Sequence, residues 1–434
     1  MVTKTISIKK LIKSLGYLLI IIAPLDVYRI KFPMINLSVY RIIFVFFVAI
    51  YISYLILYKK IVKSNKYILL YLTLLSSFVG IAQSIKLGNS LPFFINEVMG
   101  IILIIIFINI YSYDDIEKLI NTFLLSLSIS VFFSLYTYYQ FFVLGNLIKK
   151  LPFVDNLVFF AEVNHLTQGG VISGLPRLML PYATPPQLAL VISIGIILVS
   201  FKLKFKKKGK FRYVPLLVLL FLILLGTMSR SSIVPIFLVF IVYLFFEFIY
   251  VKKKNTLIIK RIFYGSIIIL TITLIIRLFP DEILNKLFYR FTILSEGTIR
   301  HFYVRLEAIL LFAKDWKTLL IGIGSKNNIY YDGVYTHIPP LHFLSPYFTV
   351  LAENGLFGFI SVFGFYFLVY FELWGYLKRC KDYISYSLYF VLCYILLAYL
   401  FYELRLILPV WIILAIICTY INNKKNSLSK KGDV

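Results

Sequence analysis

Residues 92–112 read PFFINEVMGIILIIIFINIYS, a run of about twenty mostly apolar residues. Such runs recur along the 434-residue chain, in which hydrophobic residues make up 61% and the mean hydropathy is +0.90. A helix of about twenty apolar residues crosses a bilayer, whereas the strands of a membrane β-barrel alternate and are about ten residues long. The sequence therefore predicts an all-α polytopic membrane protein, with a single membrane-embedded domain over 1–434.

Hydropathy and flanking charge together predict about twelve membrane spans. The predicted spans lie near 11–30, 36–57, 67–86, 92–112, 119–144, 185–201, 213–228, 231–250, 257–279, 344–374, 383–402 and 406–421. The N-terminus has a basic start and an apolar core without a small-residue cleavage site, so we interpret it as a retained first helix.

The charge is strongly asymmetric, because 45 Lys and Arg against 19 Asp and Glu give a formal net charge of +26. On a soluble protein this would indicate nucleic acid. Here the cations gather in short connections that share one side of the membrane if there are twelve spans, and the positive-inside rule makes that side the cytoplasm. We therefore expect no nucleic-acid partner, cytoplasmic termini, and two long outer loops at approximately 145–184 and 279–343.

The cysteines and histidines do not form a metal pattern. Cys380, Cys393 and Cys418 show neither a pairing pattern nor metal-ligand spacing, and no acidic cluster accompanies the histidines. The sequence predicts no metal, no cofactor and no disulfide framework.

Two arginines stand where the outer loops meet the start of a predicted span. Arg177 precedes the helix start at Pro185, and Arg230 lies among serines before the span at 231–250. A guanidinium group beside a helix N-terminus suits a phosphate. The alternative for Arg177 is an interfacial arginine whose charge reaches the membrane surface. The positive-inside rule disfavours Arg230 on the outer face, which favours a ligand role.

The second loop carries two more arginines and a glycine pair. Arg300 and Arg305 fall on a predicted amphipathic helix from about Gly297 to Leu320, where a solvated polar face is the alternative. Gly322 and Gly324 predict a tight turn, and the turn lacks the strand and helix context of a dinucleotide site.

Candidate acid–base groups surround the start of the span at 344–374. His337 and His342 precede it, either as polar surface or as a general base. Glu353 lies two to three turns inside, where an ionisable residue is costly and indicates a function or a buried partner.

Several of these motifs share their order with one family. The runs RHFYVRLEAILLFAKDWKTLLIGIGS (300–325) and HIPPLHFLSPYFTVLAENGLFGFI (337–360) resemble the O-antigen polymerase and O-antigen ligase superfamily of bacterial surface-polysaccharide enzymes. The segment 352–358 resembles its A-E-x-G-x-x-G helix, and GTMSRSS (226–232) resembles its T-x-S-R element. Arg177 with Pro186 and Ala189 resembles its arginine-then-P-x-x-A element.

The resemblance implies a metal-independent glycosyltransferase in the bacterial cytoplasmic membrane, acting on undecaprenyl-diphosphate-linked glycans at the outer face. Family members often show His-Asn-x-Tyr before the glutamate, whereas this chain has Leu344-Ser345-Pro346-Tyr347 with His342 two residues earlier. This displacement favours the polymerase branch, which joins repeat units into O-antigen or capsule, with a flippase and a chain-length regulator as candidate partners.

The resemblance also implies roles for single residues. The implied base is His342, with Glu353 or His337 in second place. The implied substrate-binding residues are Arg177, Arg230, Arg300, Arg305 and Tyr347.

Three other functions stay open. A ligase would move the glycan to a different acceptor, and a flippase would move the lipid-linked oligosaccharide across the membrane. A solute transporter would need charged residues deep in paired spans. The candidates for that role either lie near predicted span ends or could pair locally: Arg41, Glu97, Glu372 and Glu403.

Overall fold

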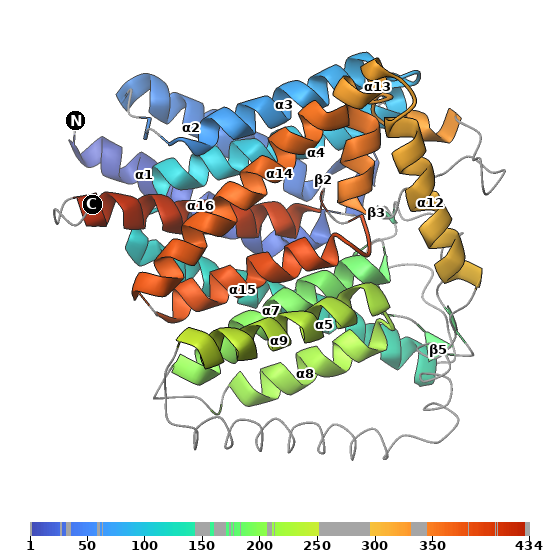
Figure 1. Cartoon of the computed structure of the whole chain (residues 1–434). Coiled ribbons are helices and arrows are strands. Elements are labelled where there is room, and N and C mark those ends of the chain that lie inside the picture. Colours follow the sequence, from blue (N-terminus) through green and yellow to red (C-terminus); the bar gives the residue numbers. More distant parts are fainter. Residues whose placement is uncertain are drawn as a thin grey trace.

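The computed structural model is a bundle of α-helices (Figure 1). It describes residues 2–26, 28–31, 36–58, 61–62, 64–143, 157–159, 171–172, 175–176, 178–182, 184–205, 211, 213–250, 296–330, 345–380, 382–403, 405 and 407–429.

The described residues form thirteen α-helices and five short strands. The helices are α1 (Val2–Ile22), α2 (Val39–Tyr58), α3 (Lys66–Ala82), α4 (Leu87–Ile110), α5 (Ile116–Phe142), α7 (Pro185–Phe205), α8 (Tyr213–Gly226), α9 (Arg230–Tyr250), α12 (Glu296–Phe312), α13 (Trp316–Ile321), α14 (Pro346–Cys380), α15 (Tyr383–Ala398) and α16 (Leu408–Ser429). The strands are β1 (Tyr28–Lys31), β2 (Asn36–Ser38), β3 (Leu157–Phe159), β4 (Val171–Ile172) and β5 (Leu175–Pro176).

Helices occupy eleven of the twelve predicted spans, and the twelfth, at 257–279, lies outside the described residues. Among the described helices, six are long and apolar enough to cross a membrane: α2, α4, α5, α7, α9 and α14. The helical class is confirmed. The number of twelve crossings stays a prediction.

Two predicted boundaries are wrong. The first span was expected to reach residue 30, but α1 ends at Ile22 and residues 28–31 form β1, which pairs antiparallel with β2 and β3. The outer-loop helix expected over 297–320 is two helices, because Asp315 caps the start of α13 by accepting a hydrogen bond from the Thr318 N–H at 2.7 Å. Helix α14, which occupies the predicted span at 344–374, is broken at Gly355.

The bundle has a buried centre and an apolar outside. Every residue of α16 from Val410 to Ile421 is buried, and α4, α14 and α5 pack against this helix. By contrast, α2 leaves Phe46 62% exposed and Ile56 69% exposed. Exposed large apolar side chains of this kind are expected on a protein surface that contacts lipid.

Both chain ends lie at one end of the bundle, and α12 and α13 lie at the opposite end (Figure 1). We call the end that holds the termini the basic end. Its ion pairs between neighbouring helices are Lys13–Asp115, Lys66–Glu372, Lys204–Glu247 and Lys424–Asp382. The end formed by α12, α13 and the start of α14 is called the loop end, and it holds the candidate site.

Candidate functional site

The site begins with a break in α14. Gly355 has φ 63° and ψ −164°, so the helical path stops after Asn354 and resumes beyond it. A side chain at Gly355 would place its Cβ atom 2.5 Å from the carbonyl carbon of Leu320 in α13. Only glycine fits a left-handed residue with another backbone this close.

The G-x-G turn after α13 caps this break. The N–H groups of Ile323 and Gly324 donate to the carbonyl oxygens of Ala352 and Glu353 at 2.9 and 3.0 Å. Gly322 and Gly324 take φ 78° and 90°, which confirms the predicted tight turn. The turn therefore supplies donors to carbonyl groups that an interrupted helix leaves without an intrahelical partner.

Asn327 joins this turn to the connection between α3 and α4. Its amide nitrogen donates to the carbonyl oxygens of Gln83 and Ile323 at 2.8 and 2.7 Å, and its amide oxygen accepts from the Ile85 N–H at 2.8 Å. Asn327 is only 3% exposed. The turn, the start of α4 and the break in α14 are thus held as one unit.

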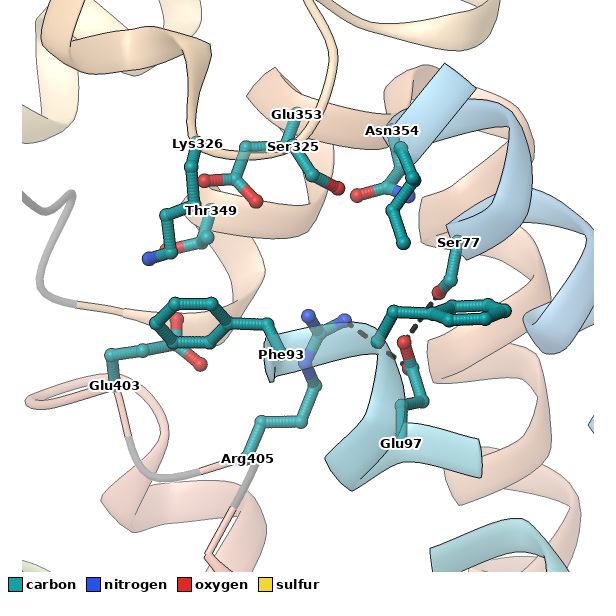
Figure 2. Close-up of a pocket in the computed structure, with 12 residues that line it drawn as sticks. Ser77, Phe93, Glu97, Ser325, Lys326, Thr349, Glu353, Asn354, Glu403 and Arg405 are labelled. Carbon is teal, nitrogen blue, oxygen red and sulfur yellow. Dashed lines mark hydrogen bonds and ion pairs between the residues drawn. The ribbon is translucent and has the colours of Figure 1, made fainter. Parts of the chain in front are cut away.

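A cavity opens beside this unit, between α3, α4, α14 and the connection from α15 to α16 (Figure 2). It is lined by Ser77, Ile81, Phe93, Phe94, Glu97, Ser325, Lys326, Thr349, Glu353, Asn354, Glu403 and Arg405. The cavity combines three carboxylates and two cations with two aromatic rings.

Arg405 reaches into the cavity from one side (Figure 2). Its Nη1 atom lies 3.9 Å from Oε1 of Glu97, whose other carboxylate oxygen accepts a hydrogen bond from the Ser77 hydroxyl. Burial lowers the pKa of the Arg405 guanidinium, but the carboxylates of Glu97, Glu403 and Glu353 raise the pKa further than burial lowers it. Arg405 therefore stays a cation although it is only 6% exposed.

Glu353 and Lys326 lie across the cavity from Arg405 (Figure 2). The Glu353 side chain is 5% exposed, and its carboxylate accepts a hydrogen bond from the Lys326 N–H. Lys326 has φ 59°, a conformation that residues other than glycine rarely adopt, and its Nζ atom lies 4.2 Å from the centre of the Phe93 ring. The turn thus fixes both the backbone and the carboxylate of Glu353.

Of the predicted site residues, Glu353 lines the cavity. Arg305 lies on α12, with its guanidinium carbon 6.0 Å from the centre of the Phe348 ring in α14, and burial lowers its pKa. The Tyr347 hydroxyl donates to the Leu396 carbonyl oxygen at 3.0 Å, and its ring stacks on Phe363. Tyr347 is therefore a contact between α14 and α15, and its predicted substrate contact stays a prediction.

The other predicted residues are not among the described residues that line the cavity. Arg177, His337 and His342 lie outside the described residues. The backbone of Arg300 belongs to α12, and Arg230 begins α9. Their predicted roles stay predictions.

Sequence reasoning missed Arg405 and Lys326, and it weighed Glu97 and Glu403 only as marks of a transporter. The available signal was the pair Glu403 and Arg405, two residues apart between apolar runs, together with one carboxylate inside the run 92–112. Each charge alone is ordinary near a span end. The structure brings Glu97, Lys326, Glu403 and Arg405 together from three segments.

The cavity does not resemble a metal centre. Among the described residues, no group of three or more His, Cys, Asp or Glu side chains is arranged to hold a metal ion.

Neither the known family models nor the curated proteins contain a match to this chain.

Proposed function

We propose that this protein polymerises undecaprenyl-diphosphate-linked oligosaccharide repeat units into a bacterial surface polysaccharide, and that the cavity around Glu353 is where the new bond forms. The observation that carries the proposal is the position of Glu353. It lies in the A-E-x-G segment that resembles the polymerase and ligase superfamily, and it faces Arg405 in a cavity at the loop end.

The reaction needs a base, and Glu353 is held for that role. A hydroxyl oxygen of the incoming unit attacks the anomeric carbon of the growing chain, while the bond from that carbon to the diphosphate oxygen breaks. The hydroxyl proton passes to Glu353, and undecaprenyl diphosphate leaves with the electron pair. A positioned carboxylate contributes about 10²–10⁴-fold to such a step. His342 is the alternative base.

The departing diphosphate needs cations near the cavity. Arg305 is the described candidate, because α12 packs Val304 and Ala308 against Ala352, the neighbour of Glu353. A guanidinium group can donate two parallel hydrogen bonds to phosphate oxygens. Arg177, Arg230 and Arg300 complete the proposed set.

The orientation of the bundle supports an outer-face site. Lysine and arginine are enriched on the cytoplasmic side of membrane proteins. The basic end carries cations at the ends of α7, α14 and α16. We propose that the basic end with both termini is cytoplasmic. The loop end then faces the leaflet that presents lipid-linked repeat units.

A transporter or a flippase of lipid-linked oligosaccharides is the second candidate, and one observation favours it. The broken helix α14 beside buried charges is a feature of membrane transporters. A matching broken partner is not among the described helices, in which Gly355 is the one interior residue with non-helical backbone angles.

A detergent experiment separates the two candidates. Purified protein in micelles receives undecaprenyl-diphosphate-linked units extracted from cells that lack the gene, and the products are separated on a gel. A polymerase yields a ladder of lengthening chains, since the reaction needs no compartments. A transporter or flippase leaves single units, and that result would overturn the proposal. A ligase would also leave the units unjoined until its own acceptor is added.

A further inference from the structure

Several buried polar atoms of the cavity lack a hydrogen-bond partner among the described residues. Oε1 of Glu97 and both carboxylate oxygens of Glu403 are out of reach of solvent, and none accepts a hydrogen bond from the residues that the structure describes. Nε of Arg405 is likewise buried without an acceptor in that part of the chain. Glu97 and Arg405 are only 3% and 6% exposed. Leaving buried polar groups unpaired is costly, so a ligand that pairs them is favoured.

The charges around the cavity are also unbalanced. Three carboxylates, Glu97, Glu353 and Glu403, face the two cations Arg405 and Lys326. Arg405 forms an ion pair with Glu97, with Nη1 3.9 Å from Oε1, and the Nζ atom of Lys326 lies over the Phe93 ring. The described lining residues therefore carry one formal negative charge in excess, and Glu403 is the carboxylate with no hydrogen-bond donor among them.

The missing positive charge suits an organic cation better than a metal ion. In the described part of the chain the carboxylates do not converge on one point, as metal ligation requires. An ammonium group has donors in three directions and suits separated carboxylates. The Nε–H group of Arg405 could in addition donate a hydrogen bond to a nearby acceptor of the ligand, such as a hydroxyl oxygen.

We infer that the cavity binds a protonated amine with a neighbouring hydroxyl, as an amino sugar carries them, with Glu403 as the main partner of the amine. The Phe93 and Phe94 rings add apolar faces on which the C–H side of a sugar ring can pack. This inference rests on the proposed function for the source of the amine, which is then the acceptor sugar beside Glu353. It predicts that the cavity rejects uronic acids, since their carboxylates would add to the excess negative charge.

The test is a binding measurement that needs no turnover. Purified protein in detergent is titrated with the glucosamine disaccharide, with its N-acetylated counterpart, and with a glucuronate-containing disaccharide. We expect the glucosamine disaccharide to bind at least tenfold more tightly than the N-acetylated form, and the glucuronate to bind least. Equal affinities, a preference for the neutral or acidic sugar, or no binding at all would overturn the inference.

Ethanolamine separates a sugar site from a site for any amino alcohol, such as a lipid headgroup. If the sugar ring contributes, ethanolamine binds at least tenfold more weakly than the glucosamine disaccharide. Equal binding of both would overturn the assignment to an amino sugar.

A variant assigns the preference to one carboxylate. Glu403→Gln keeps the shape of the side chain and removes its charge, so the preference for the glucosamine disaccharide should fall about tenfold, or about 1.4 kcal/mol. An unchanged preference would overturn the role of Glu403. If Glu403→Gln does not fold, the ligand comparison on the unaltered protein still decides whether the amine is recognised.

The binding result and the polymerisation result are independent. A ladder without an amine preference leaves the proposed function standing and removes this inference. An amine preference without a ladder leaves the amine site and removes its proposed use as an acceptor site.

Discussion

The N–H group of Gly324 donates a hydrogen bond to the carbonyl oxygen of Glu353 at 3.0 Å. This contact joins the turn after α13 to the residue at which α14 breaks. The neighbouring Lys326 N–H donates to the carboxylate of the same glutamate. One short loop therefore satisfies the end of a broken helix and also orients the proposed base.

The break itself makes the first prediction. Gly355→Ala introduces a left-handed alanine and a Cβ atom 2.5 Å from the Leu320 carbonyl carbon, so we expect the free energy of unfolding to fall by about 2 kcal/mol or more. Thermal melting of the purified protein in detergent measures the change. The matched control is Gly375→Ala in the same helix, where a Cβ atom meets nothing within 4 Å, and this variant should be as stable as the original or slightly more stable. Equal melting temperatures for all three proteins would contradict the described break.

Asn327 makes the second prediction. Asn327→Ala removes three hydrogen bonds and leaves the Ile85 N–H and the carbonyls of Gln83 and Ile323 without this partner. The expected loss of stability is about 3 kcal/mol, since each buried group left unpaired costs about 1–3 kcal/mol. The control is Asn89→Ala, because Asn89 is exposed and makes one long contact of 3.5 Å to Tyr330. If both variants melt alike, Asn327 does not hold the loop end together.

The pair Glu97 and Arg405 makes the third prediction. Removing one partner of a buried ion pair costs about 3–5 kcal/mol, because the other charge stays buried. We expect Glu97→Gln and Arg405→Gln each to lower the melting temperature, and the double variant to lose about 1–2 kcal/mol less than the two single losses combined. A double-mutant cycle measures this coupling. Additive losses would show that the two charges do not interact.

The sequence predicted the helices well because apolar runs of about twenty residues leave few alternatives. It did not predict the end of α1. The predicted span 11–30 runs past Ile22 through Asp26 and Arg29 into β1, and element boundaries are the least reliable part of a prediction from sequence. The break at Gly355 is likewise not evident from hydropathy, because apolar residues lie on both sides of Glu353, Asn354 and Gly355. Its cause is the approach of α13, which is a tertiary contact.

The site was predicted only in part. Glu353 was identified, because a carboxylate inside an apolar run is costly. Arg405 and Lys326 were not, because each stands in a connection where a cation is ordinary. Their importance comes from meeting Glu97 and Glu353 across four segments, and one sequence does not reveal such a meeting.

Topology makes the fourth prediction. Trp316 on α13 is 76% exposed at the loop end, and Ser427 is exposed near the end of α16. In a background without Cys380, Cys393 and Cys418, we expect a membrane-impermeant maleimide to label Trp316→Cys in intact cells. Ser427→Cys should be labelled only after the cells are opened. The reverse pattern would place the cavity on the cytoplasmic side and contradict the proposed polymerase.

The most direct measurement is chain growth by Glu353→Gln in detergent, with lipid-linked units from cells that lack the gene. We expect the unaltered protein and Asp114→Asn, an exposed carboxylate variant at the basic end, to build a ladder at similar rates. We expect Glu353→Gln to fold, to melt within a few degrees of the unaltered protein, and to build the ladder at least about 100-fold more slowly. A well-folded Glu353→Gln protein that polymerises at the original rate would show that Glu353 is not the base of the polymerisation.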